Sequence, residues 1–373
     1  MARDMKVTCV TVWQMDLPLT RSYRLSGGRL EVTTLDSTFL RIDTDEGLSG
    51  WGEACPWGHT YLPAHGPGVR AGLQILAPAL LGHDPCALDD VNRLMDSTLP
   101  GHPYVKAALD IACWDILGQA AGMPLWRLMG AETAEAVPVN SSIPTAAPEE
   151  MIASIEAARA AGYRTHSAKI GGDDPARDIA RIDAIEAARL PGEAVTYDVN
   201  RAWTPALAVE VLNSVSARGW VEQPCETLDL CARVARRVPQ PIMLDECLHS
   251  FEDHLEAWRC DACDGVKVKP NRLGGLTKAR RIRDFGIAAG WRMHIEDVGG
   301  TVLADTAALH LAASTPGEHR LASWLCHAHL AADPLPGQGA RNMDGRAALP
   351  ESPGIGVTPS PDALGEPVAV YGG

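Results

Sequence analysis

The stretch VTYDVN, residues 195–200, starts as an apolar strand pattern and then places a carboxylate, Asp198, near its end. A lone buried carboxylate is costly unless a positive group meets it. The pattern recurs twice, because Glu222 ends the strand-like stretch in VEQP and Asp245 the one in MLDE. The intervals of 24 and 23 residues each fit one strand plus one helix. This regular spacing predicts that the three carboxylates end consecutive strands of one sheet.

From about residue 137 onward, short apolar stretches alternate with segments of helical periodicity such as PEEMIASIEAARAAG. Strands that are apolar throughout and separated by helices predict a parallel sheet covered by helices. Eight such units would close into a βα barrel. The alternative is a doubly wound open sheet, but the glycine-rich motif that usually follows the first strand of that fold is not found in the sequence here. The strand candidates are residues 137–143, 164–170, 194–200, 220–224, 241–246, 265–270, 292–297 and 321–325.

The first 130 or so residues have a different pattern. Two strand-like stretches and a DEG turn predict an antiparallel meander, and helical periodicity follows at 68–81, 87–97 and 103–120. The Pro/Gly-rich tail has no barrel strand left to supply, so we expect it to return to this first module. The predicted fold is an α/β, modified (β/α) TIM-type barrel at 133–332, with an α+β capping domain at 1–132 and a C-terminal segment at 333–373.

Composition narrows the class of protein. Hydrophobic residues make up 46% and charged residues 21%, as in globular proteins, and the net charge of −14 argues against nucleic acid or an anionic membrane as partner. No apolar run is long enough to cross a bilayer, and the start has no signal-peptide pattern, so a cytoplasmic location is expected. The ten cysteines follow no disulfide pattern, and the CxxC of Cys260 and Cys263 has no second ligand pair for zinc.

In a parallel barrel all strand carboxyl ends meet at one rim, which would bring Asp198, Glu222 and Asp245 side by side. Three like charges in a low-dielectric mouth repel unless a cation lies among them. Oxygen ligands without Cys or His favour Mg²⁺, with Mn²⁺ as second choice. Taken singly, each carboxylate is equally consistent with a helix cap or a salt bridge. Asn200 and Glu246 lie beside these residues as possible outer partners.

Two lysines flank the carboxylate series. Lys169 ends the strand before Asp198, and Lys269 ends the strand after Asp245, which places them on opposite walls of a barrel. A lysine near a divalent cation and a second lysine is less readily protonated and becomes a usable base. Lys267 lies on the same strand face and is a rival for the role of Lys269. A single strand-end lysine would otherwise be an exposed solubilising charge.

Together, the motifs SAKIGG, YDVN, EQP, LDE, VKVKPNRLGG and HIEDVGG resemble the enolase superfamily, in its muconate-lactonising subgroup, over essentially the whole chain. The resemblance implies a capped barrel, Mg²⁺ bound by Asp198, Glu222 and Asp245, and acid/base lysines at 169 and 269. Its members bind a small carboxylate substrate on the metal and remove the α-proton to give an enediolate. They often form even-numbered assemblies, so a homo-oligomer is expected.

One departure is Ser167, which stands where the subgroup usually has the first lysine of Lys-x-Lys; its hydroxyl would bind substrate instead. Trp324, Leu325 and Cys326 replace the Asp-x-Asp of the dipeptide epimerases. The motifs are most similar to the branch that acts on proline derivatives, by dehydrating cis-3-hydroxy-L-proline or epimerising proline betaines. The predicted polar pocket favours the dehydratase. Trp324 would either hold a ring ammonium by a cation–π contact or pack between barrel and cap.

Further substrate-binding candidates are weaker. His294 and Glu296 end the seventh strand, and His59 and Tyr61 lie on a loop at 57–65 that would close the pocket, as would Tyr23 or Arg24. The histidines at 327 and 329 are expected in solvent. Two other classes of protein remain as alternatives. A metal-binding barrel without catalysis would not need the paired lysines, and an acid-sugar dehydratase would need a His–Asp base pair in place of Lys269.

Overall fold

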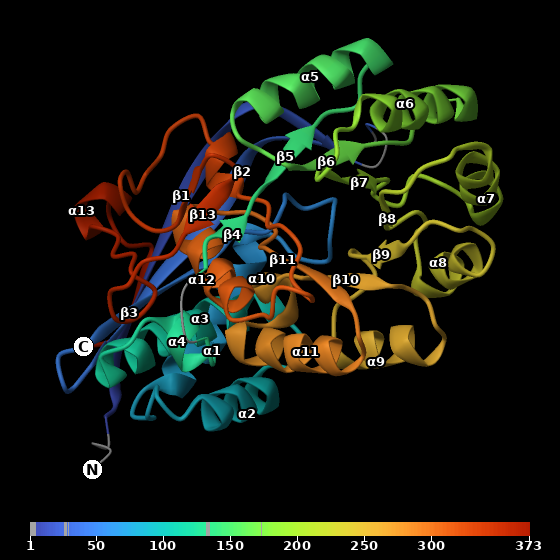
Figure 1. The fold of residues 1–373 in the computed structure, drawn as a ribbon. Coiled ribbons are helices and arrows are strands. Elements are labelled where there is room, and N and C mark those ends of the chain that lie inside the picture. Colours follow the sequence, from blue (N-terminus) through green and yellow to red (C-terminus); the bar gives the residue numbers. More distant parts are fainter. Residues whose placement is uncertain (1–4, 26–27, 29, 132–134, 173) are drawn as a thin grey trace.

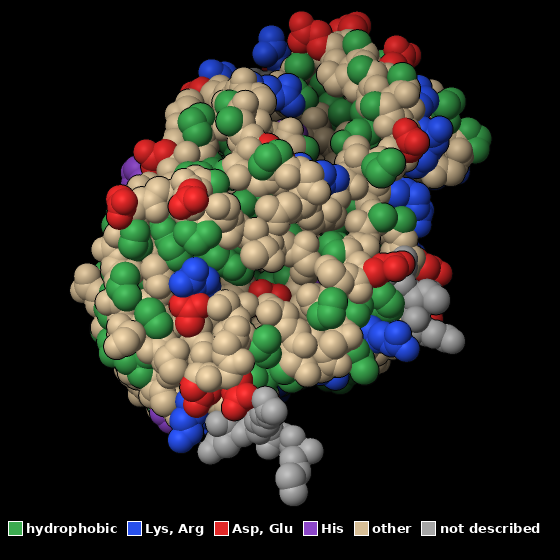
Figure 2. Space-filling model, turned by 90° about the vertical axis from the view of Figure 1, so that its left-hand side faces the viewer, with side chains coloured by type: hydrophobic (Ala, Val, Ile, Leu, Met, Phe, Trp, Pro, Cys, Tyr) green, Lys and Arg blue, Asp and Glu red, His purple; other side chains and the backbone are tan. Residues whose placement is uncertain are grey.

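The computed structural model describes residues 5–25, 28, 30–131, 135–172 and 174–373. It contains two main bodies, an antiparallel sheet with helices and a curled parallel sheet with helices on its outside (Figure 1). The predicted capped barrel is therefore confirmed as the fold class. On the face shown in Figure 2, acidic and basic side chains are interspersed among hydrophobic ones. No helix of the described residues has the length and apolar character needed to span a membrane.

The capping sheet is antiparallel, with strand order β14-β1-β2-β3. Strands β2 and β3 are joined by the predicted DEG turn, and Asp43 pairs with Ser49 across it. The helices match their predicted positions to within two residues. The strands are β1 (Val7–Leu25), β2 (Leu30–Thr44), β3 (Ser49–Ala54) and β14 (Ala369–Gly372), and the helices are α1 (Gly66–Leu80), α2 (Leu88–Thr98), α3 (Pro103–Ala121) and α4 (Leu125–Leu128).

The second body is a seven-stranded parallel sheet in sequential order from β5 to β11, as the alternation of strands and helices predicts. Its strands are β5 (Asn140–Ile143), β6 (Thr165–Lys169), β7 (Ala194–Asp198), β8 (Trp220–Glu222), β9 (Ile242–Leu244), β10 (Gly265–Val268) and β11 (Arg292–Ile295). The intervening and following helices are α5 (Pro148–Ala160), α6 (Pro175–Ala188), α7 (Pro205–Ser214), α8 (Leu228–Ala235), α9 (Phe251–Arg259), α10 (Pro270–Leu273), α11 (Leu276–Ala288) and α12 (Val302–Ala313).

The predicted eighth strand at 321–325 is wrong as an extended strand. Within this described segment, only single bridges form, from Arg320 to Met293 on β11 and from Ser323 to Val139 beside β5. The backbone amide of Ser323 donates to the carbonyl of Pro138 at 2.8 Å. The segment thus hydrogen-bonds to both edges of the sheet and closes the barrel with few bonds. We call residues 319–323 the seam.

The first predicted strand, at 137–143, is divided in two. β4 (Val137–Pro138) joins a separate antiparallel sheet with β13 (Arg346–Ala348) and β12 (Arg341–Met343), while β5 alone enters the barrel. Proline has no amide hydrogen for the ladder, which favours a break at position 138. The tail also contains the short helix α13 (Pro361–Leu364) and strand β14, which pairs with β1 of the capping sheet.

Helix α3 connects the two bodies. Its side chains are buried along almost the whole length, because the capping sheet covers one side and the barrel the other. Gly52 on β3 allows the close approach, since a Cβ there would lie 1.9 Å from the carbonyl oxygen of Ala108. On the barrel side, Asp110 accepts hydrogen bonds from the amide and hydroxyl of Thr277 on α11. This helix holds the cap over the mouth of the barrel.

Candidate active site

The three carboxylates of the series lie at the carboxyl ends of neighbouring strands, as their spacing predicts. Asp198 and Glu222 pair directly in the ladder between β7 and β8, and Asp245 follows β9 by one residue. Each side chain is at most 3% exposed. All three line one cavity of about 50 Å³, which we call the inner site.

The two predicted catalytic lysines line the same cavity from strands β6 and β10, with the three carboxylate-bearing strands between them. The Lys169 ammonium donates to Asp198 and, at 3.1 Å, to the side-chain oxygen of Asn200. The Lys269 ammonium donates to Asp245 at 2.8 Å. Each lysine is thus held by a different member of the carboxylate series.

Lys267 is also buried in the inner site but has different partners. Its ammonium donates to Glu296 at 2.8 Å and lies 3.1 Å from Glu222. Arg272, which the sequence reasoning did not single out, is 1% exposed and donates to Asp245 at 2.6 Å. Its position inside the VKVKPNRLGG motif was the available signal, since that motif also supplies Lys267 and Lys269. The site therefore holds carboxylates and cations in close alternation.

These contacts set the protonation of the charged groups. Burial alone would lower the pKa of Lys169, but the neighbouring Asp198 carboxylate outweighs it and raises that pKa above its ordinary value. Burial, reinforced by the Asp198 charge, raises the pKa of Glu222. Burial opposes the ionised form of Asp245, yet the charges of Lys269 and Arg272 hold its pKa below the usual range. As arranged here, the carboxylates favour the ammonium form of Lys169.

The donor set fits a hard divalent cation. Asp198, Glu222 and Asp245 offer only oxygen. One buried carboxylate oxygen of Glu222 accepts no hydrogen bond from the described residues, although the Lys267 ammonium lies 3.1 Å from it. Within the described residues, no group of three His, Cys, Asp or Glu side chains already has its donor atoms gathered as in a filled metal site. Lysine and arginine groups contact these oxygens instead, so a bound cation would take over part of those contacts.

Aromatic rings form one wall of the inner site, which we call the aromatic wall: Tyr23, Trp57 and Trp324. The ring centroids of Trp324 and Trp57 are 5.7 Å apart, and those of Tyr23 and Trp57 are 5.1 Å apart. The Lys169 ammonium lies 5.6 Å from the Tyr23 ring centroid. The backbone amide of Trp324 donates to Glu296 at 2.9 Å. Trp324 packs between barrel and cap and at the same time faces the cavity.

Most of the predicted substrate-binding side chains also face the inner site. Its lining includes Ser167, Asn200, Lys267, Glu296, Trp324 and Tyr61. In the described part of the chain the lining includes neither His59, which is exposed, nor His294. His294 is instead buried below the mouth, where its ring contacts the carbonyl of Ala322 and the side chain of Asn140. Burial lowers the pKa of His294 to about 4, so the ring is neutral near pH 7.

The expectation that His327 and His329 lie in solvent is wrong. His327 is 9% exposed and pairs with the Asp305 carboxylate at 2.6 Å in the 3₁₀-helix η2 (Cys326–His329). The ring of His329 stacks on Trp324 with centroids 5.2 Å apart. Burial lowers the pKa of His329 to about 4. The histidines support the aromatic wall from behind, because the cap covers this loop.

All ten cysteines are free thiols.

Comparisons with known proteins agree with this fold. Residues 150–363 match the family model "Enolase C-terminal domain-like", and residues 10–130 match "Mandelate racemase / muconate lactonizing enzyme, N-terminal domain". Cis-3-hydroxy-L-proline dehydratase of Roseibium aggregatum is 42% identical over 98% of this chain and 100% of that protein. L-Ala-D/L-Glu epimerase of Bacillus subtilis is 32% identical, over 83% of this chain and 86% of that protein.

A similar solved structure is a member of the enolase superfamily from Roseovarius nubinhibens, crystallised in complex with magnesium. It is 68% identical to this chain, covers 99% of it and 100% of its own length, and superposes with a TM-score of 0.96.

Proposed function

Because the chain belongs to the mandelate racemase/muconate lactonizing enzyme family of the enolase superfamily, we propose that it is a magnesium-dependent hydro-lyase. Its proposed substrate is cis-3-hydroxy-L-proline and its product 1-pyrroline-2-carboxylate. The similarity to a dehydratase of that name over the full length of both chains supports this choice. The single observation that carries the proposal is the pair Lys169 and Lys269, which face one small cavity across three carboxylate-bearing strands.

Asp198, Glu222 and Asp245 are the residues that would hold Mg²⁺. When bound, the ion supplies positive charge that binds the substrate carboxylate and offsets the charge that develops there as the α-proton leaves. The chain's own contribution is to present three buried oxygen ligands at fixed strand ends. Arg272 fixes one of them, since it holds Asp245 from the side opposite Lys269 in a bond of 2.6 Å.

The two lysines then suit an anti elimination. In cis-3-hydroxy-L-proline the hydroxyl and carboxylate share one ring face, so the α-hydrogen lies on the other. One lysine, as the free amine, takes the α-proton, and the opposite lysine, as ammonium, protonates the departing 3-hydroxyl. The Cα–H and C3–O bonds break, a Cα=C3 double bond forms and water leaves. The resulting enamine tautomerises to the ring imine.

The aromatic wall and Glu296 would orient the ring. The indole face of Trp324 offers a cation–π contact to a ring ammonium, and Glu296 fixes the backbone of Trp324. Ser167, which lines the cavity in place of the usual lysine, offers a hydroxyl to a polar ring substituent. These contacts suit a small proline-derived carboxylate and leave the two lysines to act on opposite faces.

A second candidate function is supported by the same wall. A proline betaine carries a quaternary nitrogen, which favours an aromatic enclosure, and Trp57, Trp324 and Tyr23 supply more aromatic surface than the three Phe of the sequence led us to expect. The two lysines would then pass a proton across Cα, as in 2-epimerisation. Epimerases also occur among the relatives of this chain.

One assay separates the two reactions. The protein is incubated with Mg²⁺ and cis-3-hydroxy-L-proline, and the imine is detected with 2-aminobenzaldehyde. In parallel, L-proline betaine is incubated in D₂O and deuterium at Cα is followed by NMR. Imine formation with no betaine exchange supports the hydro-lyase. Betaine exchange without imine reverses the ranking, and neither signal rejects both candidates.

A further inference from the structure

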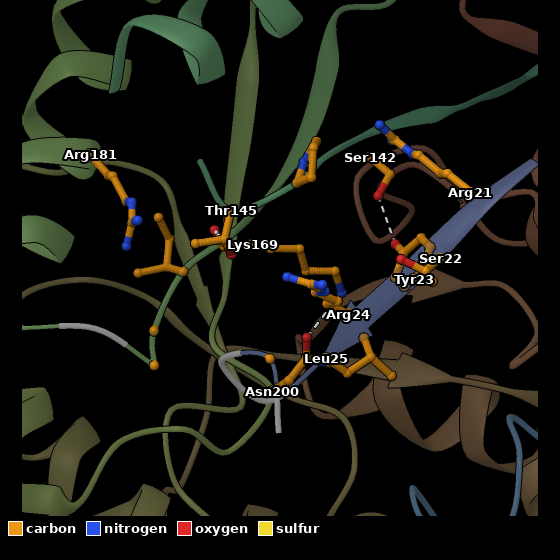
Figure 3. Close-up of a pocket in the computed structure, with 15 residues that line it drawn as sticks. Arg21, Ser22, Tyr23, Arg24, Leu25, Ser142, Thr145, Lys169, Arg181 and Asn200 are labelled. Atoms are coloured by element: carbon orange, nitrogen blue, oxygen red, sulfur yellow. Dashed lines mark hydrogen bonds between the residues drawn. The ribbon is translucent and has the colours of Figure 1, made fainter. Parts of the chain in front are cut away.

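A second and larger cavity adjoins the inner site, and we call it the outer chamber. Its volume is about 320 Å³, which falls within the range of small-molecule sites. The two cavities share four lining residues, namely Tyr23, Leu25, Lys169 and Asn200. The outer chamber therefore ends where the proposed chemistry begins, at the Lys169 ammonium. Figure 3 shows Lys169 and Asn200 at its centre, with strand β1 along one side.

The charged side chains that line the outer chamber are all cationic. They are Arg21 and Arg24 from β1, Lys169 from β6 and Arg181 from α6, and its described lining contains no Asp or Glu. In Figure 3 Arg21 and Arg181 lie on opposite sides of the chamber, and Arg24 lies between them near Lys169. This lining contrasts with the whole chain, whose net charge is −14.

Two of the four cations are compensated locally. Lys169 bonds to Asp198, and Arg181 bonds to Asp178 at 3.1 Å. The two β1 arginines differ from them, because both are exposed and neither is held by a buried acid. Arg24 is 3.7 Å from an exposed glutamate, at a distance where solvent screens the pair, and Arg21 forms no ion pair with any described residue. The excess positive charge of the chamber thus comes from Arg21 and Arg24.

A concave surface lined by one sign of charge concentrates ligands of the opposite sign and raises their association rate. Here the effect matters, because the acidic protein as a whole repels anions. We propose that the outer chamber is a binding vestibule for small monocarboxylates, in which Arg21 and Arg24 receive the carboxylate before it passes Tyr23 into the inner site. The assignment of substrate class rests on the proposed function, whereas the binding of anions does not.

The test uses pyrrole-2-carboxylate, a planar five-membered-ring monoanion, as probe with the full-length protein and Mg²⁺. Association is followed by stopped-flow through the intrinsic tryptophan fluorescence, to which Trp57 and Trp324 beside the inner site contribute, at salt concentrations between about 20 mM and about 500 mM. The variant is Arg21→Gln/Arg24→Gln. The matched control is Arg233→Gln, which removes a charge from an equally exposed arginine on α8 that is not among the described lining of either cavity.

We expect the double variant to associate about three- to tenfold more slowly than the wild type at low salt and to lose most of the salt dependence. Charge reversal in Arg21→Glu lowers the association rate further. Equal rates in the double variant and in Arg233→Gln overturn the vestibule, as does a wild-type protein that does not bind the probe.

The two proposals fail in different ways. Arginine-dependent probe association without imine from cis-3-hydroxy-L-proline rejects the hydro-lyase and leaves the vestibule standing. Imine formation with unchanged association in the double variant rejects the vestibule alone.

Discussion

The three lysines of the inner site differ in the carboxylates that they contact. Lys267 and Lys269 are buried and Lys169 is nearly so, with 13% of its side chain exposed. Their closest carboxylates differ: Asp198 for Lys169, Glu296 and Glu222 for Lys267, and Asp245 for Lys269. Lys267 thus has two carboxylates within 3.1 Å, whereas the second carboxylate near Lys269, that of Glu296, lies 3.9 Å away. This difference in partners is the physical reason to assign proton transfer to Lys169 and Lys269 and a supporting role to Lys267.

Removal of either proposed catalytic lysine tests this assignment. We expect Lys169→Ala and Lys269→Ala each to lower the kcat of imine formation by about 10²- to 10⁴-fold, the usual contribution of general acid or base catalysis. The control is Lys6→Ala, which removes an exposed lysine before β1. Full activity in Lys269→Ala would move the role to Lys267, its neighbour on the same strand face.

The aromatic wall gives a second prediction at this scale. Trp324→Ala removes the indole face and is expected to raise KM about three- to thirtyfold, with a smaller change in kcat, because a cation–π contact is worth about 0.5–2 kcal/mol. Trp324→Phe should restore part of the loss. Trp258→Ala, at a tryptophan that is 53% exposed, is the control. An unchanged KM in Trp324→Ala would indicate that the ring only packs.

Among elements, β3 of the cap and α12 of the barrel are joined by one fully buried acid. Glu53 accepts hydrogen bonds from the amide and hydroxyl of Thr301, from the amide of Ala304 and from the hydroxyl of Ser37. Ser37 lies on β2, whereas Thr301 and Ala304 lie at the start of α12, where backbone amides otherwise lack partners. Burial nevertheless outweighs these bonds and raises the pKa of Glu53 to about 7.

This link predicts a pH dependence of stability. The folded state keeps the Glu53 proton up to a pKa of about 7, whereas the unfolded chain loses it near the ordinary glutamate pKa of 4.5. The free energy of unfolding should therefore fall as pH rises between these values, by about 3 kcal/mol from this group alone. Urea denaturation across that range should show a correspondingly flatter profile for Glu53→Gln. The exposed substitution Glu252→Gln should keep the wild-type slope, and parallel profiles for all three proteins would contradict the prediction.

The elements also show what could be predicted from sequence and what could not. The carboxylate series was predictable because a parallel βα repeat turns regular spacing into neighbourhood in space, and the lysines followed from the same rule. The seam was not, since its hydrogen bonds to Pro138, Asn140 and Met293 depend on how far the curled sheet closes. The aromatic wall was missed as a unit because Tyr23, Trp57 and Trp324 come from segments with no common period.

Considered as a whole molecule, the inner site requires both bodies. The barrel supplies the carboxylates and lysines, while the cap supplies Tyr23, Trp57 and Tyr61. The domain boundaries predicted at residues 132 and 332 stay a prediction. The tail pairs through β13 with β4, just before the first barrel strand, and through β14 with β1 of the cap. A ligand that binds between the bodies should therefore stabilise the whole fold.

Magnesium provides the corresponding measurement. At about 100 times its Kd, an ion that binds only the folded state adds about 2.7 kcal/mol to the free energy of unfolding, so Tm should rise on addition of MgCl₂ and fall with EDTA. Asp198→Asn should lose most of this shift. Asp229→Asn, at an exposed aspartate on α8, should retain it. An equal shift in both variants would show that the ion stabilises the protein from another place.

The seam has a consequence for how such proteins diversify. It is joined to the two sheet edges by isolated bridges, and the chain that leaves it carries Trp324 into the pocket. The proposed metal-binding acids, by contrast, lie at the carboxyl ends of strands β7 to β9, which form a continuous ladder. Substitutions around residues 319–324 can thus reshape the ring-facing wall while the proton-transfer apparatus keeps its geometry. Substitutions that change the substrate are therefore expected to be tolerated best in this segment.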